Sequence, residues 1–409
     1  MSHRNQEPDQ SPLKVCIVSS GTLPVPPSRG GAVETLIMSL VRRNESEQRM
    51  ELTVTSVADD KAQQMAEQYR HTKFLFIPQS SNLIEVAYHY WQAIWKRIFP
   101  QSHIMTSLYY RKVLRAIRNE HFDAVVFEGG ESYGFKAYDQ VFHGTLWYHI
   151  HATPEFTTPS AYFNDAMAIS DFVAQQWRHW CTDSAQHVHV LYNGVDTAAF
   201  RQAFSAQQIQ NLRAQYGFTS DDFIVLFCGR LFRGKGVKEL AQAVASIHDG
   251  SVKLLIAGYA HDAEAKKYAA ELDAIAQTSD GRIKLTGYIP NEKMPLYYHS
   301  SDIQVVPSLW EEGAGNICIE GMAAGLPIIA TKSGGMPEYL DPRCSVLVDR
   351  GETLVQDLAA NIIALKNRPE QRARMSSFAQ QRAEHFSNSA YYDAYVHLLA
   401  DQQTRKEHQ

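Results

Sequence analysis

The stretch WEEGAGNICIEGMAAGLPIIAT, from Trp310 to Thr331, holds two carboxylates, Glu312 and Glu320, eight positions apart. It follows the apolar run DIQVVPS at residues 302–308, so the pattern predicts a buried strand, a glycine-broken loop and a helix from about Ile317. Glycines let backbone amides approach a ligand at a helix N-terminus, and carboxylates accept hydrogen bonds from hydroxyls. The stretch therefore suits a sugar, although a plain strand-to-helix connection with a capping glutamate is the commoner meaning of such a pair by itself.

The composition is that of a globular chain with two domains. At 409 residues the chain exceeds one ordinary core, so two domains of about 180 residues each are expected. Hydrophobic residues make up 44% and charged residues 20%, and the net charge of -5 argues against a nucleic-acid partner. The cysteines are widely spaced and form no CxxC pair, so we expect reduced core residues at Cys16, Cys181, Cys228, Cys318 and Cys344.

The N-terminal sequence MSHRNQEPDQSP is polar. It predicts a disordered tail over residues 1–12, without a signal peptide or membrane span, and a cytoplasmic protein.

Apolar runs alternate with helical patterns in both halves of the chain, which predicts two doubly wound domains with a cleft between them. A polar stretch from about residue 196 to 222 separates the halves, so the domains are expected at 13–195 and 196–384, before a closing helix at about 385–402. The predicted strands are LKVCIVSS, ELTVTSVA, KFLFIP, FDAVVFEGG, TLWYHIHAT, DAMAIS, HVHVLYNGVD, FIVLFC, KLLIAG, RIKLTGYIP, DIQVVPS and LPIIAT.

A glycine pair, Gly30 and Gly31, precedes the first predicted helix, which runs from about Ala32 to Arg43. Exposed backbone amides at this place can meet an anion. A tight turn is the commoner meaning of a glycine pair, and the loop is not a GxGxxG fingerprint.

Residues 82–120 interleave aromatic and basic side chains. Amphipathic aromatics with basic charge suit the face of an anionic membrane or a lipid-linked acceptor, which gives the hypothesis of peripheral contact with the inner face of the membrane. Helices that pack an aromatic stripe on the sheet and leave a solvated basic face explain the pattern equally well. The residues concerned are Tyr88, Tyr90, Trp91, Trp95, Phe99, Tyr109 and Tyr110 with Lys96, Arg97, Arg111, Lys112, Arg115 and Arg118.

Two predicted strands of the first half end in Glu128 and His151. Ligands bind at such strand ends in open parallel sheets, so His151 is well placed to line a site, although core packing is the commoner role of a single histidine there. His149 and His151 face the same way along their strand, as do His187 and His189. No carboxylate or third ligand follows at a supporting spacing, so we predict no metal site.

In the second half, the strand FIVLFC runs into GRLFRGKG, which places Arg230 just after the strand and Lys235 at the end of a glycine-bounded turn. Paired guanidinium donors and a mobile ammonium together suit a diphosphate. The turn is not a Walker A loop, and a basic turn by itself is usually solvated surface. The glutamate pair further along the chain makes a shared site the better interpretation.

Three segments in this order resemble the retaining glycosyltransferases of the GT4 family: GRLFRGKG, DIQVVPSLWEEGAGNICIEGMAAGLPIIAT, and SGGMPE at Ser333 to Glu338. NGVD, AISDFVAQQW and GGAVETLI agree, and the likeness extends from residue 13 to about 400. It implies the GT-B fold, an α/β architecture of two Rossmann-like domains facing a central cleft. The first domain would be on the acceptor side, with the closing helix crossing back onto it, and the second would bind the nucleotide sugar.

The resemblance also implies a role for each matching residue. Arg230 and Lys235 would bind the donor diphosphate, and Glu320 the ribose hydroxyls. Glu312 would hold a hydroxyl of the donor hexose, and His151 would lie against that sugar. The implied donor-binding set is completed by Gly30, Gly31, Tyr288 near the base, and the backbone of Gly313, Ala314, Gly315, Asn316 and Ile317. Ala314 and Asn316 depart from the residues usual in the family, which implies a wider and more polar sugar pocket.

The implied reaction transfers a hexosyl unit, with retention, from a UDP-linked or other nucleoside-diphosphate sugar to a hydroxyl of a cell-surface glycan or glycolipid. No DxD triplet occurs, so we expect neither a metal nor another cofactor. A phosphorylase, a nucleotide-sugar epimerase and a non-catalytic sugar-nucleotide or glycan-binding coat or scaffold protein are the alternatives. The full set of arginine, lysine and two glutamates weighs against the last of these.

Overall fold

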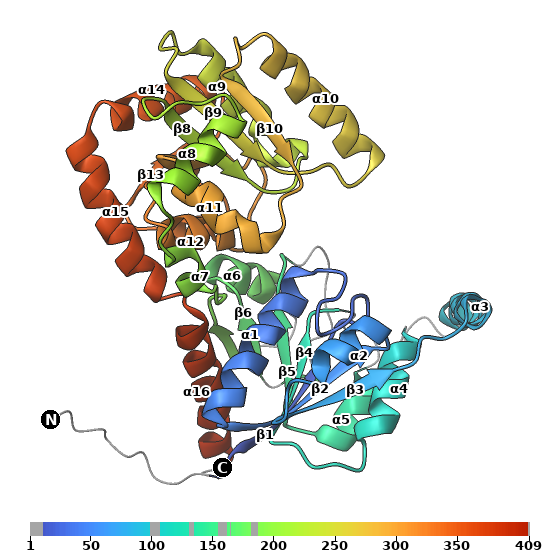
Figure 1. Cartoon of the computed structure of the whole chain (residues 1–409). Coiled ribbons are helices and arrows are strands. Elements are labelled where there is room, and N and C mark those ends of the chain that lie inside the picture. The colour runs from blue at the N-terminus through green and yellow to red at the C-terminus, as the bar shows by residue number, and fades with distance from the viewer. Residues whose placement is uncertain are drawn as a thin grey trace, which may run out of the picture. The chain divides into compact units, whose positions relative to one another are not determined.

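The computed structural model describes residues 11–98, 107–130, 135–153, 162–163, 165–180 and 187–407. Most of the predicted N-terminal tail lies outside these ranges, as do Phe99 and Cys181. Contacts divide the chain into two units, Met1–Gly194 with Tyr391–Gln409, and Val195–Ala390. Each unit is an α/β body with its own parallel sheet (Figure 1), which confirms the predicted fold class.

The sheet of the first unit has seven parallel strands in the order β3-β2-β1-β4-β5-β6-β7. The central strands β4 and β5 are buried along their whole length, as continuous apolar runs predict for a covered parallel sheet. The strands are β1 (Leu13–Val18), β2 (Met50–Val57), β3 (Thr72–Ile77), β4 (Ala124–Glu128), β5 (Leu146–Ile150), β6 (Asp165–Ala168) and β7 (His187–Val190).

Helices alternate with these strands along the chain. The helix predicted from about Ala32 is confirmed as α1 and runs on to Glu47, and residues 82–120 contain two helices, α3 and α4. The helices of this unit are α1 (Ala32–Glu47), α2 (Asp60–Ala66), α3 (Asn82–Ile98), α4 (Leu108–Ile117), α5 (Lys136–Phe142) and α6 (Asp171–Trp180).

The closing helix α16 (Asn388–Glu407) packs into the core of the first unit. Tyr392 is fully buried there and donates a hydrogen bond of 2.7 Å to Asn44 of α1. Further along the helix, Gln402 accepts a hydrogen bond of 2.8 Å from the indole of Trp147 in β5. The C-terminal segment therefore folds with strands that precede it by more than two hundred residues.

The sheet of the second unit has six parallel strands in the order β10-β9-β8-β11-β12-β13. Its core gathers the apolar faces of these strands and of the helices beside them. The strands are β8 (Phe223–Cys228), β9 (Val252–Ala257), β10 (Ile283–Gly287), β11 (Ile303–Val306), β12 (Ile328–Thr331) and β13 (Ser345–Val348).

Helices and two short 3₁₀ turns connect the strands of the second unit. The predicted helix after the glycine-rich loop is confirmed as α12, which begins at Asn316. The elements are α7 (Thr197–Arg201), α8 (Ala206–Gln215), η1 (Arg233–Lys235), α9 (Val237–Ser246), α10 (Ala263–Gln277), η2 (Asn291–Lys293), α11 (Met294–His299), α12 (Asn316–Ala323), α13 (Met336–Tyr339), α14 (Leu354–Lys366) and α15 (Pro369–Glu384).

Both sheets reverse their strand order at one point, between β1 and β4 in the first unit and between β8 and β11 in the second. The connections on either side of such a point diverge, so the carboxyl ends of the two strands leave room for a ligand. Four of the cysteines are buried and free, as predicted: Cys16, Cys228, Cys318 and Cys344. Among the described residues, no helix is long and apolar enough to cross a membrane.

Candidate active site

The loop after β8 is shaped by a glycine with positive φ. Residues 233–235 form η1, and Gly236 ends it with φ 65° before α9 begins. A Cβ atom on Gly236 would lie 1.9 Å from the carbonyl oxygen of Pro307, at the end of β11. Only glycine permits both the positive φ and the close contact with Pro307. The turn that carries Lys235 therefore packs directly against the end of β11.

Lys235 and Glu312 form a close ion pair. The ammonium lies 2.6 Å from Glu312 Oε1, and the two side chains are only 13% and 11% exposed. Ser308 donates a hydrogen bond of 2.5 Å to the same oxygen. The two residues were predicted to bind different parts of a ligand, and the structure shows that they also bind each other.

Two cations of this loop lie close to aromatic rings. The Arg230 guanidinium lies 5.5 Å from the ring centroid of Phe232, and the Lys235 ammonium lies 5.8 Å from the same centroid and 5.4 Å from that of Trp310. Arg230 is exposed. Two cations beside one ring form a compact positive site at the carboxyl end of β8.

Arg233, the third cation of the loop, has a different partner. Its guanidinium makes two contacts, of 3.2 and 2.5 Å, with the carboxylate of Glu271 in α10. The pairing turns its guanidinium towards α10 and raises its pKa, with the Glu271 hydrogen bonds as the main cause. Arg233 is therefore distinct from Arg230 and Lys235.

The segment SGGMPE holds the backbone of Glu312 in place. The Glu312 amide donates to Ser333 Oγ at 3.2 Å, and its carbonyl accepts from the Gly335 amide at 2.8 Å. Gly334 has φ 50°, and a Cβ atom there would lie 2.2 Å from the Glu312 carbonyl oxygen. The two glycines after Ser333 thus let a distant loop close over the main chain of a site residue.

Glu320 lies in α12 and receives a hydrogen bond of 2.7 Å from the hydroxyl of Tyr298, which is fully buried. Burial raises the pKa of Glu320 to about 7, and the Tyr298 hydrogen bond opposes this rise in part. The carboxyl group is therefore poised to change its ionisation near neutral pH when its surroundings change. Tyr298 was not singled out in the sequence, because nothing local marks it as the partner of a residue in another helix.

No side chain caps the N-terminus of α12. Its N-cap is Gly315, and the Cys318 and Ile319 amides both donate to the Gly315 carbonyl. Gly313, Ala314 and Asn316 are partly exposed, as expected for backbone that a ligand can approach.

Two exposed tyrosines stand at the neighbouring strand ends. Tyr288 follows β10 and is 64% exposed, and Tyr259 follows β9 and is 42% exposed. Their rings meet edge to face at 5.2 Å. The Tyr259 carbonyl accepts the Leu231 amide at 3.2 Å, so the pair adjoins the loop that carries Arg230. Only Tyr288 was predicted as a site residue.

In the first unit, Gly30 and Gly31 lie directly before α1, as predicted, with φ 78° and 122°. A Cβ atom on Gly31 would lie 2.0 Å from the carboxylate of Glu34, which is buried. The start of α1 therefore already faces a carboxylate of its own first turn, and burial raises the pKa of that group.

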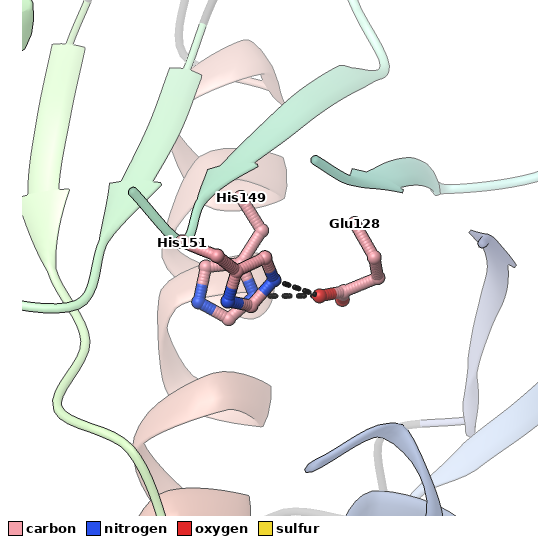
Figure 2. Close-up of side chains that lie close together, drawn as sticks. All are labelled: Glu128, His149 and His151. Carbon is pink, nitrogen blue, oxygen red and sulfur yellow. Dashed lines mark hydrogen bonds and ion pairs between the residues drawn. The ribbon is translucent and has the colours of Figure 1, made fainter. Parts of the chain in front are cut away.

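His151 is 13% exposed and belongs to a buried cluster with Glu128 and His149 (Figure 2). Glu128 Oε2 lies 2.8 Å from His151 Nε2 and 2.9 Å from His149 Nδ1. The reason given above for excluding a metal was therefore wrong, since tertiary structure brings a carboxylate to the histidine pair. Sequence spacing could not predict this cluster, because Glu128 lies in β4 and the histidines lie in β5 and directly after it.

The chain thus consists of two Rossmann-like units, each with polar and charged side chains where strands of its parallel sheet end. Residues 208–382 match the family model described as Glycosyl transferases group 1. Residues 208–382 therefore belong to this family, and the chain is a glycosyltransferase with the GT-B fold.

Individual relatives and a solved structure are also similar to this chain. Spore coat protein SA of Bacillus subtilis (strain 168) is 23% identical over 395 residues, which cover 95% of this chain and 98% of that protein. Lipopolysaccharide 1,2-N-acetylglucosaminetransferase of Salmonella typhimurium is 33% identical over 136 residues, 32% of this chain and 35% of that protein. The crystal structure of Anabaena Alr3699/HepE in complex with UDP and glucose has the same fold, with TM-score 0.71, 21% identity, and coverage of 95% of this chain and 100% of that one.

Proposed function

We propose that the chain is a retaining hexosyltransferase that uses a nucleoside-diphosphate sugar, UDP-linked, as its donor. The observation that carries the proposal is the contact between Lys235 and Glu312, with Arg230 beside the same aromatic ring as Lys235. Cations suit the diphosphate of such a donor, and a carboxylate suits a hydroxyl of its sugar. The Anabaena protein of similar fold, described in complex with UDP and glucose, supports UDP as the nucleotide.

The proposed reaction breaks the bond between the anomeric carbon and a diphosphate oxygen. It forms a bond from the same carbon to the acceptor oxygen on the same face, and the acceptor proton passes to an oxygen of the departing diphosphate. Negative charge grows on that group, so the fixed cations of Arg230 and Lys235 stabilise the transition state more than the ground state. Together with the amides at the start of α12, they take the part of a metal ion, and we propose that no metal or other cofactor is needed.

Other residues complete the donor site in this proposal. Glu320 accepts hydrogen bonds from the ribose hydroxyls, and the exposed Tyr288 contacts the base, for which its edge-to-face partner Tyr259 extends the aromatic surface. Gly31 and His151 of the first unit keep the roles that the resemblance implies.

The proposed acceptor is a hydroxyl of a cell-surface glycan or glycolipid. The matching Salmonella relative is named for transfer onto lipopolysaccharide, which supports an acceptor of this class. An amphipathic surface on the first unit supports an acceptor held at a membrane.

That surface is the outer face of α3. Tyr110 of α4 is buried in the core, and the Tyr109 hydroxyl forms hydrogen bonds with Ser19 and Thr55. These two aromatic side chains of α4 therefore pack inside the unit and are not available to a membrane. Along α3, by contrast, large apolar side chains are exposed: Leu83, Ile84, Val86, Tyr90, Trp91, Ile94 and Ile98. Arg97 is exposed on the same helix, and α4 adds the exposed Arg111 and Arg115, followed by the exposed Arg118 at its C-cap. Apolar side chains flanked by cations suit an anionic bilayer, and we propose this as their partner.

Flotation with acidic vesicles tests the membrane contact. Fully burying one apolar side chain contributes about 1.5–3 kcal/mol, so the double variant Ile84→Asp/Ile94→Asp should reduce vesicle binding about tenfold or more. The control Gln63→Asp/Gln64→Asp adds the same charge to exposed positions of α2. Equal binding by the two variants, or no preference of the wild type for acidic over neutral vesicles, would remove this part of the proposal.

Transfer of radiolabelled sugar from UDP-sugars tests the reaction. Arg230→Ala should lower turnover about a hundredfold, by analogy with the loss of one charge-stabilising donor. Arg233→Ala removes a neighbouring cation whose partner is Glu271 on the surface, so turnover should change less than about fivefold. Equal effects of the two substitutions would refute the role of Arg230.

The same assay separates the alternatives. An epimerase would convert the donor without an acceptor. A coat or scaffold protein would bind a sugar nucleotide without turning it over, and the relative named Spore coat protein SA, which matches nearly the whole chain, makes this control necessary.

A further inference from the structure

The cluster at the ends of β4 and β5 arises from strand register. Glu128 is paired with His149 across the parallel ladder. Side chains two positions apart point to the same face of an extended chain, so His151 follows His149 to that face. Figure 2 shows both imidazoles beside one carboxylate, although only His149 and His151 are close in the sequence.

The hydrogen bonds of this cluster define which ring nitrogens carry protons. The two histidines share a single oxygen, Glu128 Oε2, at 2.9 and 2.8 Å. An ionised carboxylate can only accept, so both His149 Nδ1 and His151 Nε2 must donate. The histidines lower the pKa of Glu128 to about 2 against the opposing effect of its burial, which keeps it ionised. Burial, followed by the charge of His149, lowers the pKa of His151, which favours its neutral form.

A neutral imidazole protonated at Nε2 carries a lone pair at Nδ1. Glu128 and His149 are 1% and 0% exposed, whereas His151 is 13% exposed, so His151 is the member of the cluster that a ligand can reach. Three further buried groups feel the charge of Glu128, which adds to the effect of burial in raising their pKa values: Tyr391 and Tyr395 of α16, and Glu34 of α1.

We propose that Glu128 and His149 are positioning residues for His151: they hold its Nε2–H, so that Nδ1 is presented as the acceptor for a hydroxyl of the donor sugar. The proposal rests on the proposed function, in which His151 lies against that sugar. Neither Glu128 nor His149 touches the ligand. Their effect is to fix the orientation and the tautomer of the residue that does.

A metal ion bound by the same three groups is the competing explanation. Metal-bound histidines almost always donate the remote ring N–H to a carboxylate, carbonyl or water. His149 Nε2 is buried, and among the described residues it has no hydrogen-bond partner. Among the described residues, His149 therefore lacks the hydrogen-bond acceptor that a metal-bound histidine usually has. The carboxylate of Glu128, shared by both histidines, explains the positions of the two rings directly.

Two substitutions of Glu128 distinguish these explanations. Glu128→Gln keeps a carbonyl oxygen that can accept both N–H groups, so donor kcat/KM should stay within about fivefold of wild type. Glu128→Leu removes the acceptor and should lower donor kcat/KM about 10- to 100-fold, the range usual for outer-shell partners. UDP has no hexose, so it should bind wild type and Glu128→Leu alike. A metal ligand would give the opposite result, with Glu128→Gln inactive and metal found by elemental analysis of the wild type only.

The double variant with His151→Ala tests whether Glu128 acts through His151. In the His151→Ala background, Glu128→Leu should have no further effect on kcat/KM. The matched control is Asp165→Asn, since Asp165 is a buried carboxylate of the same sheet, 2.9 Å from His189 Nε2. Its effect should multiply with that of His151→Ala. Equal, multiplicative losses from both carboxylate variants would overturn the proposal.

A measurement on the wild type covers the case in which Glu128→Leu does not fold. Nitrogen-15 NMR of histidine-labelled protein, assigned with His151→Ala, should show His151 as the neutral tautomer protonated at Nε2 near pH 7.5. An imidazolium or a proton on Nδ1 would refute the proposal. This result does not depend on turnover, so it is separate from any failure of the proposed function.

Discussion

Replacing Glu320 by glutamine should stabilise the free protein at alkaline pH while weakening the binding of its donor. Burial raises the pKa of Glu320 from 4.5 to about 7. The folded state therefore binds this proton more tightly than the unfolded chain. Between about pH 4.5 and 7 the unfolded chain loses the proton first, so wild-type stability falls with rising pH. Above pH 7 the loss is complete at about 3 kcal/mol, since each pKa unit corresponds to about 1.4 kcal/mol.

Glu320→Gln cannot ionise, so it should escape this loss. Thermal unfolding of wild type and variant, compared at pH 4.5 and pH 8, measures the difference directly. For a unit of this size, about 3 kcal/mol corresponds to roughly 6–12 °C in Tm. The variant should gain that much relative to wild type between the two pH values. A Tm difference that is the same at both pH values would refute the assigned pKa.

Donor binding should lower the pKa of Glu320, which burial raises in the free protein. If the Glu320 carboxylate accepts ribose hydroxyls, bound UDP favours its ionised form, and binding near pH 7 releases protons. Calorimetry in buffers of different ionisation enthalpy counts these protons. The terminal phosphate of UDP titrates near pH 6 as well, at about the value of other phosphates, and Glu320→Gln provides the correction for it. Equal proton release by wild type and variant would show that Glu320 does not contact the nucleotide.

Three further predictions concern the same unit. Gly236→Ala forces a side chain into a left-handed turn and against the Pro307 carbonyl, so urea unfolding should show a loss of about 2 kcal/mol or more, whereas Gly250→Ala, which meets no atom within 4 Å, should cost far less. Tyr288→Ala should weaken UDP binding by about 1–3 kcal/mol in calorimetry, the worth of one base stacked on an aromatic ring, with Tm unchanged because Tyr288 is exposed. Glu312→Gln frees the Lys235 ammonium from its counter-charge, so UDP should bind at least as tightly as to wild type while sugar transfer falls tenfold or more; parallel losses in both would contradict separate roles for the two residues.

Hydrophobic patterning was sufficient to predict most of the secondary structure. All twelve predicted strands are present. Most are continuous apolar runs, whereas β2 (MELTVTSV) and β7 (HVHV) alternate apolar with polar residues. The strand β13 (Ser345–Val348) was missed. The helix α15 was also missed, because its buried face consists of Met375, Ala379 and Ala383 within a strongly polar sequence.

The partners of the site residues could not be predicted in the same way. Lys235 meets Glu312 because β8 and β11 are adjacent in the sheet, and strand order is a tertiary property that periodicity does not contain. Glu128 joins His149 and His151 for the same reason, through the register of β4 and β5. Tyr298 and Tyr259 are further examples, since each is marked only by the neighbour that the fold brings to it.

The positions of the buried charges argue that they are kept for binding and not for stability. A buried ion pair or carboxylate contributes little to folding, and replacing it with apolar residues is often neutral or stabilising. Here the Lys235–Glu312 pair adjoins the strand reversal of its sheet, where β8 and β11 end, and Glu128 ends β4 at the reversal in the other sheet. Stability alone gives these charges no reason to lie at the edge where each sheet leaves room for a ligand. Asp165 is a buried carboxylate at the other edge, where β6 begins, and it is paired with His189 and Arg405. The placement of the charges at the strand reversals is what a glycosyltransferase needs if fixed side chains, held by their neighbours before the donor arrives, are to stabilise charge as it develops.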